Sequence, residues 1–229
     1  IVGGAGNRGV VLSATYEARE FGVHSAMPMA RARRMCPQAV VIAPDHRHYS
    51  RVSAGVMEIF ASITDEMEPL ALDEAFLDVS CATRRLGTPR QIGELIRSRI
   101  HDEQGITASV GASTTKFVAK LASTRAKPDG LLVIPAREIV AFLHPMKVGA
   151  LWGVGERTEE QLHRLGLRTV ADIAGTPATT LERALGPALG RHLFELSWGR
   201  DPRRVQAAES ERSIGAEETP DDLLRDADT

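Results

Sequence analysis

Cysteine is scarce in this sequence. Only Cys36 and Cys81 occur among 229 residues. Two cysteines so far apart provide neither a disulfide framework nor a CxxC metal-binding pattern. Their scarcity is typical of proteins that work in a reducing, intracellular setting, so we expect a cytoplasmic protein.

Long apolar runs are missing as well. No stretch approaches the roughly 18 consecutive apolar residues that a membrane-spanning helix needs, so we expect no membrane partner. The overall composition, 43% hydrophobic and 25% charged, is that of an ordinary globular protein. The length leaves room for one large domain or for two to three small ones.

Lysine and arginine are absent from the most acidic stretch. Residues 65–78 contain six carboxylates and no base. Within this stretch, Asp73 and Glu74 are adjacent and lie between two apolar runs that predict a β-hairpin, residues 66–72 and 75–80. Carboxylates between strands cost desolvation unless a cation meets them. Mg²⁺ binds through one or two carboxylates together with substrate phosphates.

This acidic stretch has two interpretations. One is a metal site at the tip of a hairpin, and the other is an acidic turn without chemistry. Because neighbouring residues of a regular strand point to opposite faces, Asp73 and Glu74 reach one metal only if the backbone turns or bulges there. Without such a bend, one of them is a ligand and the other supports it.

A basic segment follows the acidic one. Residues 84–127 carry nine lysines and arginines against three acids, whereas residues 205–229 carry eight acids against two bases. A basic segment beside an acidic centre suits a polyanion held next to metal ions. Lys116 and Lys120, on the polar side of a helix predicted over 115–126, are therefore candidate DNA contacts. Scattered, solvated charges are the plain alternative.

Strand and helix patterns alternate as far as residue 134, and only helical patterns follow. The interleaved helices and the hairpin predict an α+β region with a mostly antiparallel sheet. Predicted strands cover 9–14, 40–43, 106–112 and 131–134, and predicted helices cover 15–22, 48–63, 89–104 and 115–126. Residues 135–201 predict a small all-α domain.

A Gly-Val-Gly turn lies between two short helical patterns of this α domain and predicts a helix-hairpin-helix. Gly153 and Gly155 let the backbone turn tightly and approach a phosphate. The N–H groups that open the next helix point at that phosphate. Because such a contact ignores base identity, Gly153, Val154 and Gly155 predict sequence-independent DNA binding. A plain helical hairpin is the alternative.

Near the N-terminus, Tyr16 and Arg19 fall on one face of the first predicted helix. Arginine binds a phosphate by a bidentate fork and tyrosine binds it by its hydroxyl, so the pair is a candidate phosphate contact. A surface stack of the two side chains is the alternative.

Four blocks of the sequence, in order, resemble the Y family of translesion DNA polymerases, in its DinB or DNA polymerase IV branch. The blocks are residues 14–28, 72–78, 116–130 and 152–155. The resemblance implies small fingers at 1–45, a palm at 46–134 and a helix-hairpin-helix thumb at 135–201. Residues 202–229 would be a linker and the start of a little-finger domain, near Arg212.

The resemblance also implies a role for each candidate residue. Asp73 and Glu74 resemble two of three carboxylates that hold two catalytic Mg²⁺ ions, and the third, an Asp, is expected upstream of Ile1. Four residues resemble contacts to the incoming dNTP: Ser13, Tyr16, Arg19 and Lys127. The implied reaction is template-directed, low-fidelity DNA synthesis past damaged bases, within the cell's SOS response to DNA damage.

The implied partners are primer–template DNA, dNTP and a sliding clamp, the clamp being held through a region beyond Thr229. We expect a monomer. The sequence departs from the family pattern at Ala71, where a Ser is usual, and at Phe76, where a Tyr is usual. The alternatives are a catalytically incomplete DNA-binding fragment and another two-metal enzyme such as a nucleotide cyclase. The cyclase interpretation leaves the helical hairpin and Lys127 without a role.

Overall fold

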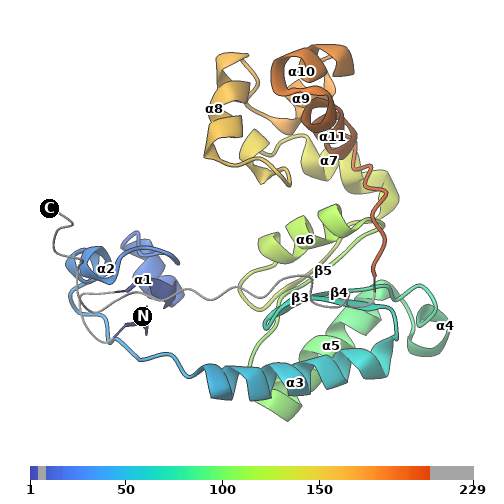
Figure 1. The fold of residues 1–229 in the computed structure, drawn as a ribbon. Helices are drawn as coiled ribbons and strands as arrows, with labels where there is room; N and C mark the ends of the chain where they lie inside the picture. Colours follow the sequence, from blue (N-terminus) through green and yellow to red (C-terminus); the bar gives the residue numbers. More distant parts are fainter. Residues whose placement is uncertain (5–8, 207–229) are drawn as a thin grey trace, which may run out of the picture. The chain divides into compact units, whose positions relative to one another are not determined.

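A computed structural model describes residues 1–4 and 9–206 of the chain (Figure 1). These residues fall into two compact units, residues 1–51 and residues 52–206, and each unit is described by itself. The expected start of a little finger near Arg212 lies outside the described residues. Among the helices described, none is both long enough and apolar enough to cross a membrane.

The first unit joins two short strands and two short helices around a small core. Strand β1 (Val2–Gly3) pairs antiparallel with β2 (Val11–Ser13), and the strand predicted over 40–43 is reduced to a single bridge between Val2 and Ile42. Helix α1 (Tyr16–Glu20) begins after Thr15, whose hydroxyl accepts a hydrogen bond from the backbone of the first turn. Helix α2 spans Met29–Met35. Their apolar faces are buried together: Val11, Ala18, Val23, Met27, Met29 and Ala32.

Helix α3 (His46–Ile63) leads into the second unit, where the acidic hairpin follows it. Strands β3 (Met67–Ala71) and β4 (Glu74–Leu77) pair antiparallel, as predicted. Leu72 and Asp73 form the turn, and the pairing register shifts between Pro69 and Ala71. The tip therefore has both a turn and an irregular register, which is the bend that the two adjacent carboxylates require.

A second strand pair in this unit is parallel. Strands β5 (Val110–Ala112) and β6 (Leu131–Val133) run side by side, because helix α6 (Lys116–Arg125) carries the chain back between them. Gly111 is required here, since a side chain on it would meet the backbone of α6 at Ala119 and Ser123. The described strands thus form three two-stranded sheets, two antiparallel and one parallel. The α+β class is confirmed, and the parallel pair is the detail that the sequence did not indicate.

Helices cover the strands of the second unit from two sides. Figure 1 shows α6 above them and α3 with α5 (Pro89–Gln104) below, beside the short helix α4 (Thr83–Leu86). Helix α5 begins in a capping box made by Thr88 and Gln91 and ends at Gly105 in the left-handed region. A ladder of isoleucines joins α3 and α5: Ile59, Ile63, Ile92, Ile96 and Ile100.

After Val133 the described chain is helical, which confirms the predicted all-α thumb. The elements are η1 (Ala136–Glu138), α7 (Ile139–Leu143), η2 (Val148–Ala150), α8 (Glu156–Arg164), α9 (Val170–Ala174), α10 (Ala178–Leu185) and α11 (Pro187–Ser197). Their core is continuous with the inner face of α6, through Phe117 and Val118. The predicted domain boundaries at residues 45 and 134 stay predictions.

Candidate functional site

The two adjacent carboxylates lie exposed at the tip of the β3–β4 hairpin. The side chain of Glu74 accepts a hydrogen bond of 2.6 Å from the ammonium of Lys120 on α6. Within the described residues, the carboxylate of Asp73 forms no hydrogen bond or ion pair. The carboxylate of Asp73 is therefore open to an external ligand, whereas the carboxylate of Glu74 is paired with the ammonium of Lys120.

The hairpin tip fits the carboxylate share of a Mg²⁺ site. Both side chains offer hard oxygen ligands, and the bent backbone frees them from the strict alternation of a regular strand. Across residues 1–4 and 9–206, no three acidic, His or Cys side chains come together as a metal cluster. Asp73 and Glu74 would thus hold Mg²⁺ together with oxygens from another source, such as phosphates.

Lys116 lies one helical turn before Lys120 and is held differently. Its ammonium lies 2.6 Å and 2.5 Å from the two carboxylate oxygens of Glu68 on β3. The side chains of Lys116 and Glu68 are only 11% and 20% exposed. Burial pushes the pKa of Glu68 up, but hydrogen bonds from Lys116 and from the backbone of Gln206 outweigh burial and leave that pKa below its usual value. The predicted DNA contact at Lys116 stays a prediction, and the geometry gives its ammonium a structural task.

Lys127 is exposed on the turn that follows α6. Arg97 of α5 holds this turn: its guanidinium donates to the backbone carbonyl of Asp129 at 2.6 Å and to its carboxylate at 2.7 Å. A third bond, from Nε to the carbonyl of Ala108, fixes the guanidinium itself. Asp129 has a positive φ of 43°, a strained region for a residue other than glycine. In the sequence Arg97 is only one of the nine bases of residues 84–127, since its partner is 32 residues away.

In the first unit, three predicted nucleotide contacts are exposed together around the start of α1: Ser13, Tyr16 and Arg19. The Arg19 guanidinium lies 5.4 Å from the centre of the Tyr16 ring. Its Nε donates to the carbonyl of Ala14 at 3.0 Å, and its other two nitrogens make no hydrogen bond within the described part of the chain. The stack and a phosphate contact are thus compatible, because those nitrogens form the bidentate fork.

The thumb turn has the backbone that a phosphate contact needs. Gly153 has φ of +92°, which a side chain would strain, and Gly155 is the N-cap of α8 without a side-chain capping bond. A Cβ built on either glycine would meet nothing within 4 Å. Both glycines are exposed, and no side chain caps the first N–H groups of α8. Glu156 and Glu159 in the first turn weaken the attraction of this helix end for an anion.

Comparisons with known proteins assign the chain to a family. A family model described as impB/mucB/samB matches residues 1–124, more than half of the chain, and a model described as the DNA polymerase-iota thumb domain matches residues 149–201. DNA polymerase IV of Alkalilimnicola ehrlichii is 47% identical over 220 residues, which cover 96% of this chain and 62% of that protein. The chain belongs to the Y family of DNA polymerases, in its DinB branch.

Other members of the Y family agree. DNA polymerase IV of Exiguobacterium sibiricum is 43% identical, over all of this chain and 64% of its own length. A crystal structure of DinB from Sulfolobus solfataricus matches with a TM-score of 0.80 and 30% identity, over 90% of this chain and 61% of that one. An insertion ternary complex of Dbh DNA polymerase also matches with a TM-score of 0.80, at 28% identity. The chain thus spans somewhat less than two thirds of the length of these relatives.

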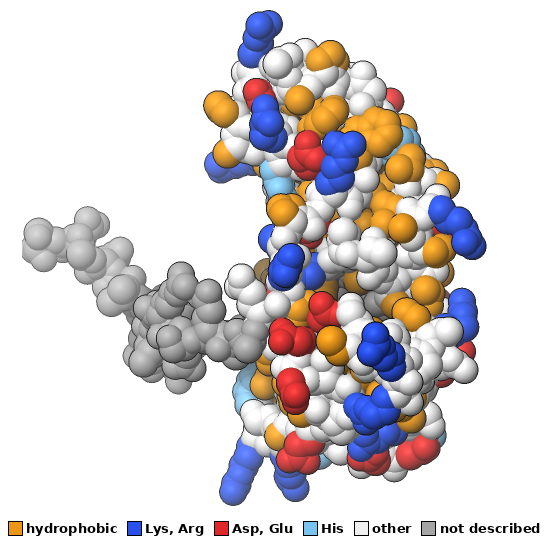
Figure 2. All heavy atoms as spheres, turned by 90° about the vertical axis from the view of Figure 1, so that its right-hand side faces the viewer, with side chains coloured by type: hydrophobic (Ala, Val, Ile, Leu, Met, Phe, Trp, Pro, Cys, Tyr) orange, Lys and Arg blue, Asp and Glu red, His pale blue; other side chains and the backbone are white. Residues whose placement is uncertain are grey.

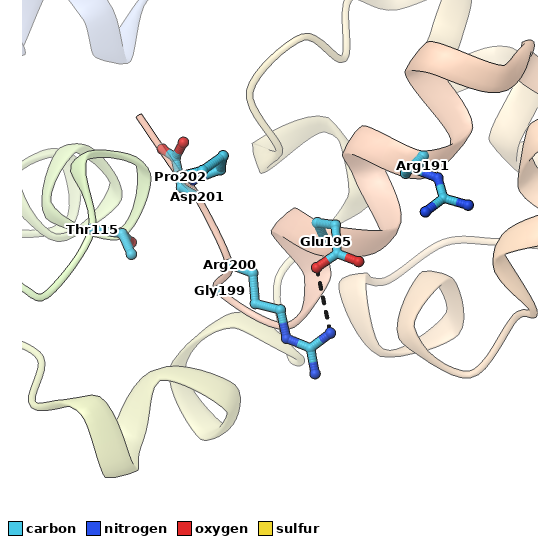
Figure 3. Close-up of a pocket in the computed structure, with 7 residues that line it drawn as sticks. All are labelled: Thr115, Arg191, Glu195, Gly199, Arg200, Asp201 and Pro202. Carbon is cyan, nitrogen blue, oxygen red and sulfur yellow. Dashed lines mark hydrogen bonds and ion pairs between the residues drawn. The ribbon is translucent and has the colours of Figure 1, made fainter. Parts of the chain in front are cut away.

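A pocket of about 660 Å³ lies apart from the predicted site residues of this Y-family chain. Its lining comes from α11, from the segment after it and from the start of α6: Thr115, Arg191, Glu195, Gly199, Arg200, Asp201 and Pro202. Figure 3 shows Arg200 joined to Glu195, an ion pair of 3.4 Å. Two arginines balanced by two acids give no net charge that favours a phosphate.

On the face shown in Figure 2, basic and acidic side chains are intermixed. Lysine and arginine side chains alternate there with aspartate and glutamate over the described residues. Among the bases of residues 84–127, Arg97, Lys116 and Lys120 are each paired with a carboxylate.

Proposed function

We propose that this chain provides the palm, fingers and thumb of a template-directed DNA polymerase, which transfers nucleotides from dNTP to a primer 3′-hydroxyl. One observation carries the proposal: Asp73 and Glu74 are exposed and adjacent on a bent hairpin tip, where the ammonium of Lys120 pairs with Glu74. Membership of the DinB branch supports the same assignment.

Each group of site residues has a distinct task in this reaction. Asp73 and Glu74 would hold Mg²⁺ together with the substrate phosphates. The bound metal would supply activation of the primer hydroxyl and neutralisation of the leaving pyrophosphate. Catalysis by the protein is then positioning and electrostatic stabilisation, as in other phosphoryl transfers.

Two sets of contacts bind the substrates. The triphosphate of dNTP is held by exposed hydroxyl and cationic side chains: Ser13, Tyr16, Arg19 and Lys127. The backbone of the primer–template duplex is held by Gly153, Val154 and Gly155 at the start of α8. Lys120, whose ammonium pairs with Glu74, would contact a DNA phosphate beside the hairpin tip.

The wider role follows from the resemblance. We assign low-fidelity synthesis past damaged bases, in the SOS response and in the cytoplasm, by a monomer that engages a sliding clamp. One similar structure, that of a DinB family error-prone DNA polymerase from Sulfolobus solfataricus, supports the low fidelity. The proposed role of the clamp rests on the family resemblance.

A chimera tests the function. This chain replaces the matching segment of the Alkalilimnicola ehrlichii polymerase, which supplies the rest of the length. We expect Mg²⁺-dependent extension of a primer, opposite an intact template and opposite an abasic site. A folded chimera that binds DNA without extending the primer would contradict the proposal and favour the DNA-binding module. The relative itself is the positive control.

A further inference from the structure

One aromatic side chain packs the thumb turn, Gly153–Gly155, against neighbouring parts of the second unit. Trp152, directly before Gly153, stacks on Phe76 with ring centres 6.3 Å apart and planes 25° apart. Phe76 lies on β4, two residues after Glu74. The guanidinium of Arg203 lies 4.3 Å from the centre of the Trp152 ring. Trp152 thus contacts both the hairpin that carries the carboxylates and the segment that follows the thumb.

Arg203 is itself fixed by a buried acid. Its guanidinium donates to both carboxylate oxygens of Asp201, at 2.8 Å and 2.9 Å. The side chain of Asp201 is fully buried, and it also accepts from the backbone N–H of Phe117 at 3.3 Å. A bidentate pair of this kind sets the orientation of the arginine plane over the ring, which a single ion pair does not.

The same segment is fastened further along to the palm. The ammonium of Lys116 donates to the carbonyl of Arg204 at 3.3 Å, and the N–H of Gln206 donates to Glu68 at 2.8 Å. Glu68 pairs in register with Phe76 across the hairpin. The buried Glu68–Lys116 pair therefore ties residues 201–206 to the strands that lead to Asp73 and Glu74.

We propose that residues 201–206 are a latch that sets the position of the thumb turn relative to the catalytic hairpin, with Trp152 clamped between Phe76 and Arg203. Its positioning residues are Glu68, Lys116, Trp152 and Arg203. The latch rests on the proposed function: it places the DNA phosphates at Gly153–Gly155 at a fixed distance from Asp73 and Glu74. When the latch opens, DNA still binds the thumb but its primer end is misplaced.

The latch can be observed without any reaction. The chain has two tryptophans, so Trp198→Phe leaves Trp152 as the sole reporter. In that background we expect Arg203→Leu to raise the acrylamide quenching constant of Trp152 by about twofold, because the guanidinium no longer covers the ring. Arg200→Leu is the matched control, since Arg200 pairs with Glu195 and should leave quenching unchanged. Equal quenching in the Arg203 variant and its parent would overturn the latch.

A kinetic experiment in the polymerase chimera tests the positioning. Arg203→Leu and Glu68→Gln should slow single-turnover incorporation at saturating DNA by about tenfold, because small misplacements of reacting groups are costly. The dissociation constant for DNA should change little, whereas partial unfolding would lower the number of active molecules and not their rate. Arg203→Lys, which keeps the charge but loses the fork, should restore only part of the rate.

The two experiments distinguish a failure of the proposed function from a failure of the latch. Loss of extension by the chimera itself would count against the proposed function, and the quenching result still decides whether the latch exists. Unchanged incorporation rates in Arg203→Leu and Glu68→Gln, in a chimera that extends primers, would overturn the positioning role.

Discussion

The ammonium of Lys120 lies 2.6 Å from the carboxylate of Glu74, one of the two acids assigned to Mg²⁺. Both side chains are more than one third exposed, so water and salt screen the pair and it contributes only about 0–1 kcal/mol. A metal ion displaces such a partner easily. The pair therefore balances the charge of Glu74 and leaves that of Asp73 uncompensated.

Removing this competitor should strengthen metal binding. We expect Lys120→Met to bind Mn²⁺, the probe in a calorimetric titration, up to about fivefold more tightly than the parent chain, which is the equilibrium equivalent of 1 kcal/mol. Arg125→Met, on the same helix, is the control. Weaker Mn²⁺ binding by the Lys120 variant than by the parent would contradict the claim that Lys120 competes with the metal for Glu74.

At the start of α8, we expect one substitution to raise the stability of the fold and to lower its affinity for DNA. Gly155→Ser adds a side-chain cap and should raise the free energy of unfolding by about 0.2–0.5 kcal/mol. The new hydroxyl then occupies the N–H groups meant for phosphate, so the affinity for duplex DNA should fall. Gly153→Ala, strained at positive φ, should instead lower stability. Unchanged DNA affinity in a stabilised Gly155→Ser would contradict the thumb contact.

The Glu68–Lys116 pair makes folding pH-dependent. Because the pKa of Glu68 is lower in the folded chain than its ordinary 4.5, the ionised carboxylate stabilises the fold above that pH. This contribution falls as the pH drops through 4.5 toward the folded value. We expect Glu68→Gln to cost about 1–3 kcal/mol at pH 7, since a charged hydrogen bond is lost. Urea unfolding should show this difference shrinking as the pH falls below 4.5; a constant difference would contradict the pairing.

Arg97 should act on the nucleotide and not on DNA. Arg97→Met frees the turn that carries Lys127 and leaves the carbonyl of Ala108 without its donor. In the polymerase chimera we expect the KM for dNTP to rise by about tenfold, the equivalent of one charge-assisted hydrogen bond. DNA affinity should stay the same, and Arg99→Met, whose partner is Glu103, is the control. An equal rise in both variants would remove the special role of Arg97.

Local patterns predicted much of this molecule. The hairpin, α5 and its end at Gly105, α6 and the thumb turn follow from periodicity, capping and glycine position, all of which act within a few residues. The helix-hairpin-helix turn and the acidic tip were predicted for the same reason.

Contacts between distant residues were beyond such patterns. Lys116 was predicted to face solvent, because nothing within its helix indicates a pairing with Glu68, 48 residues earlier. The parallel pairing of β5 with β6 depends on which way α6 returns the chain. Trp152 contacts Phe76 and Arg203, which are both more than 50 residues away in the sequence.

The most direct test of the account is single-nucleotide incorporation by the chimera with Asp73→Asn or Glu74→Gln. Asp65→Asn, in the same acidic stretch but before β3, is the matched control. We predict a loss of about 100-fold or more for each tip variant, the scale of removing one electrostatic partner of a transition state, and a near-normal rate for the control. Near-normal incorporation by Asp73→Asn and Glu74→Gln would contradict the claim that this hairpin tip holds the catalytic metals.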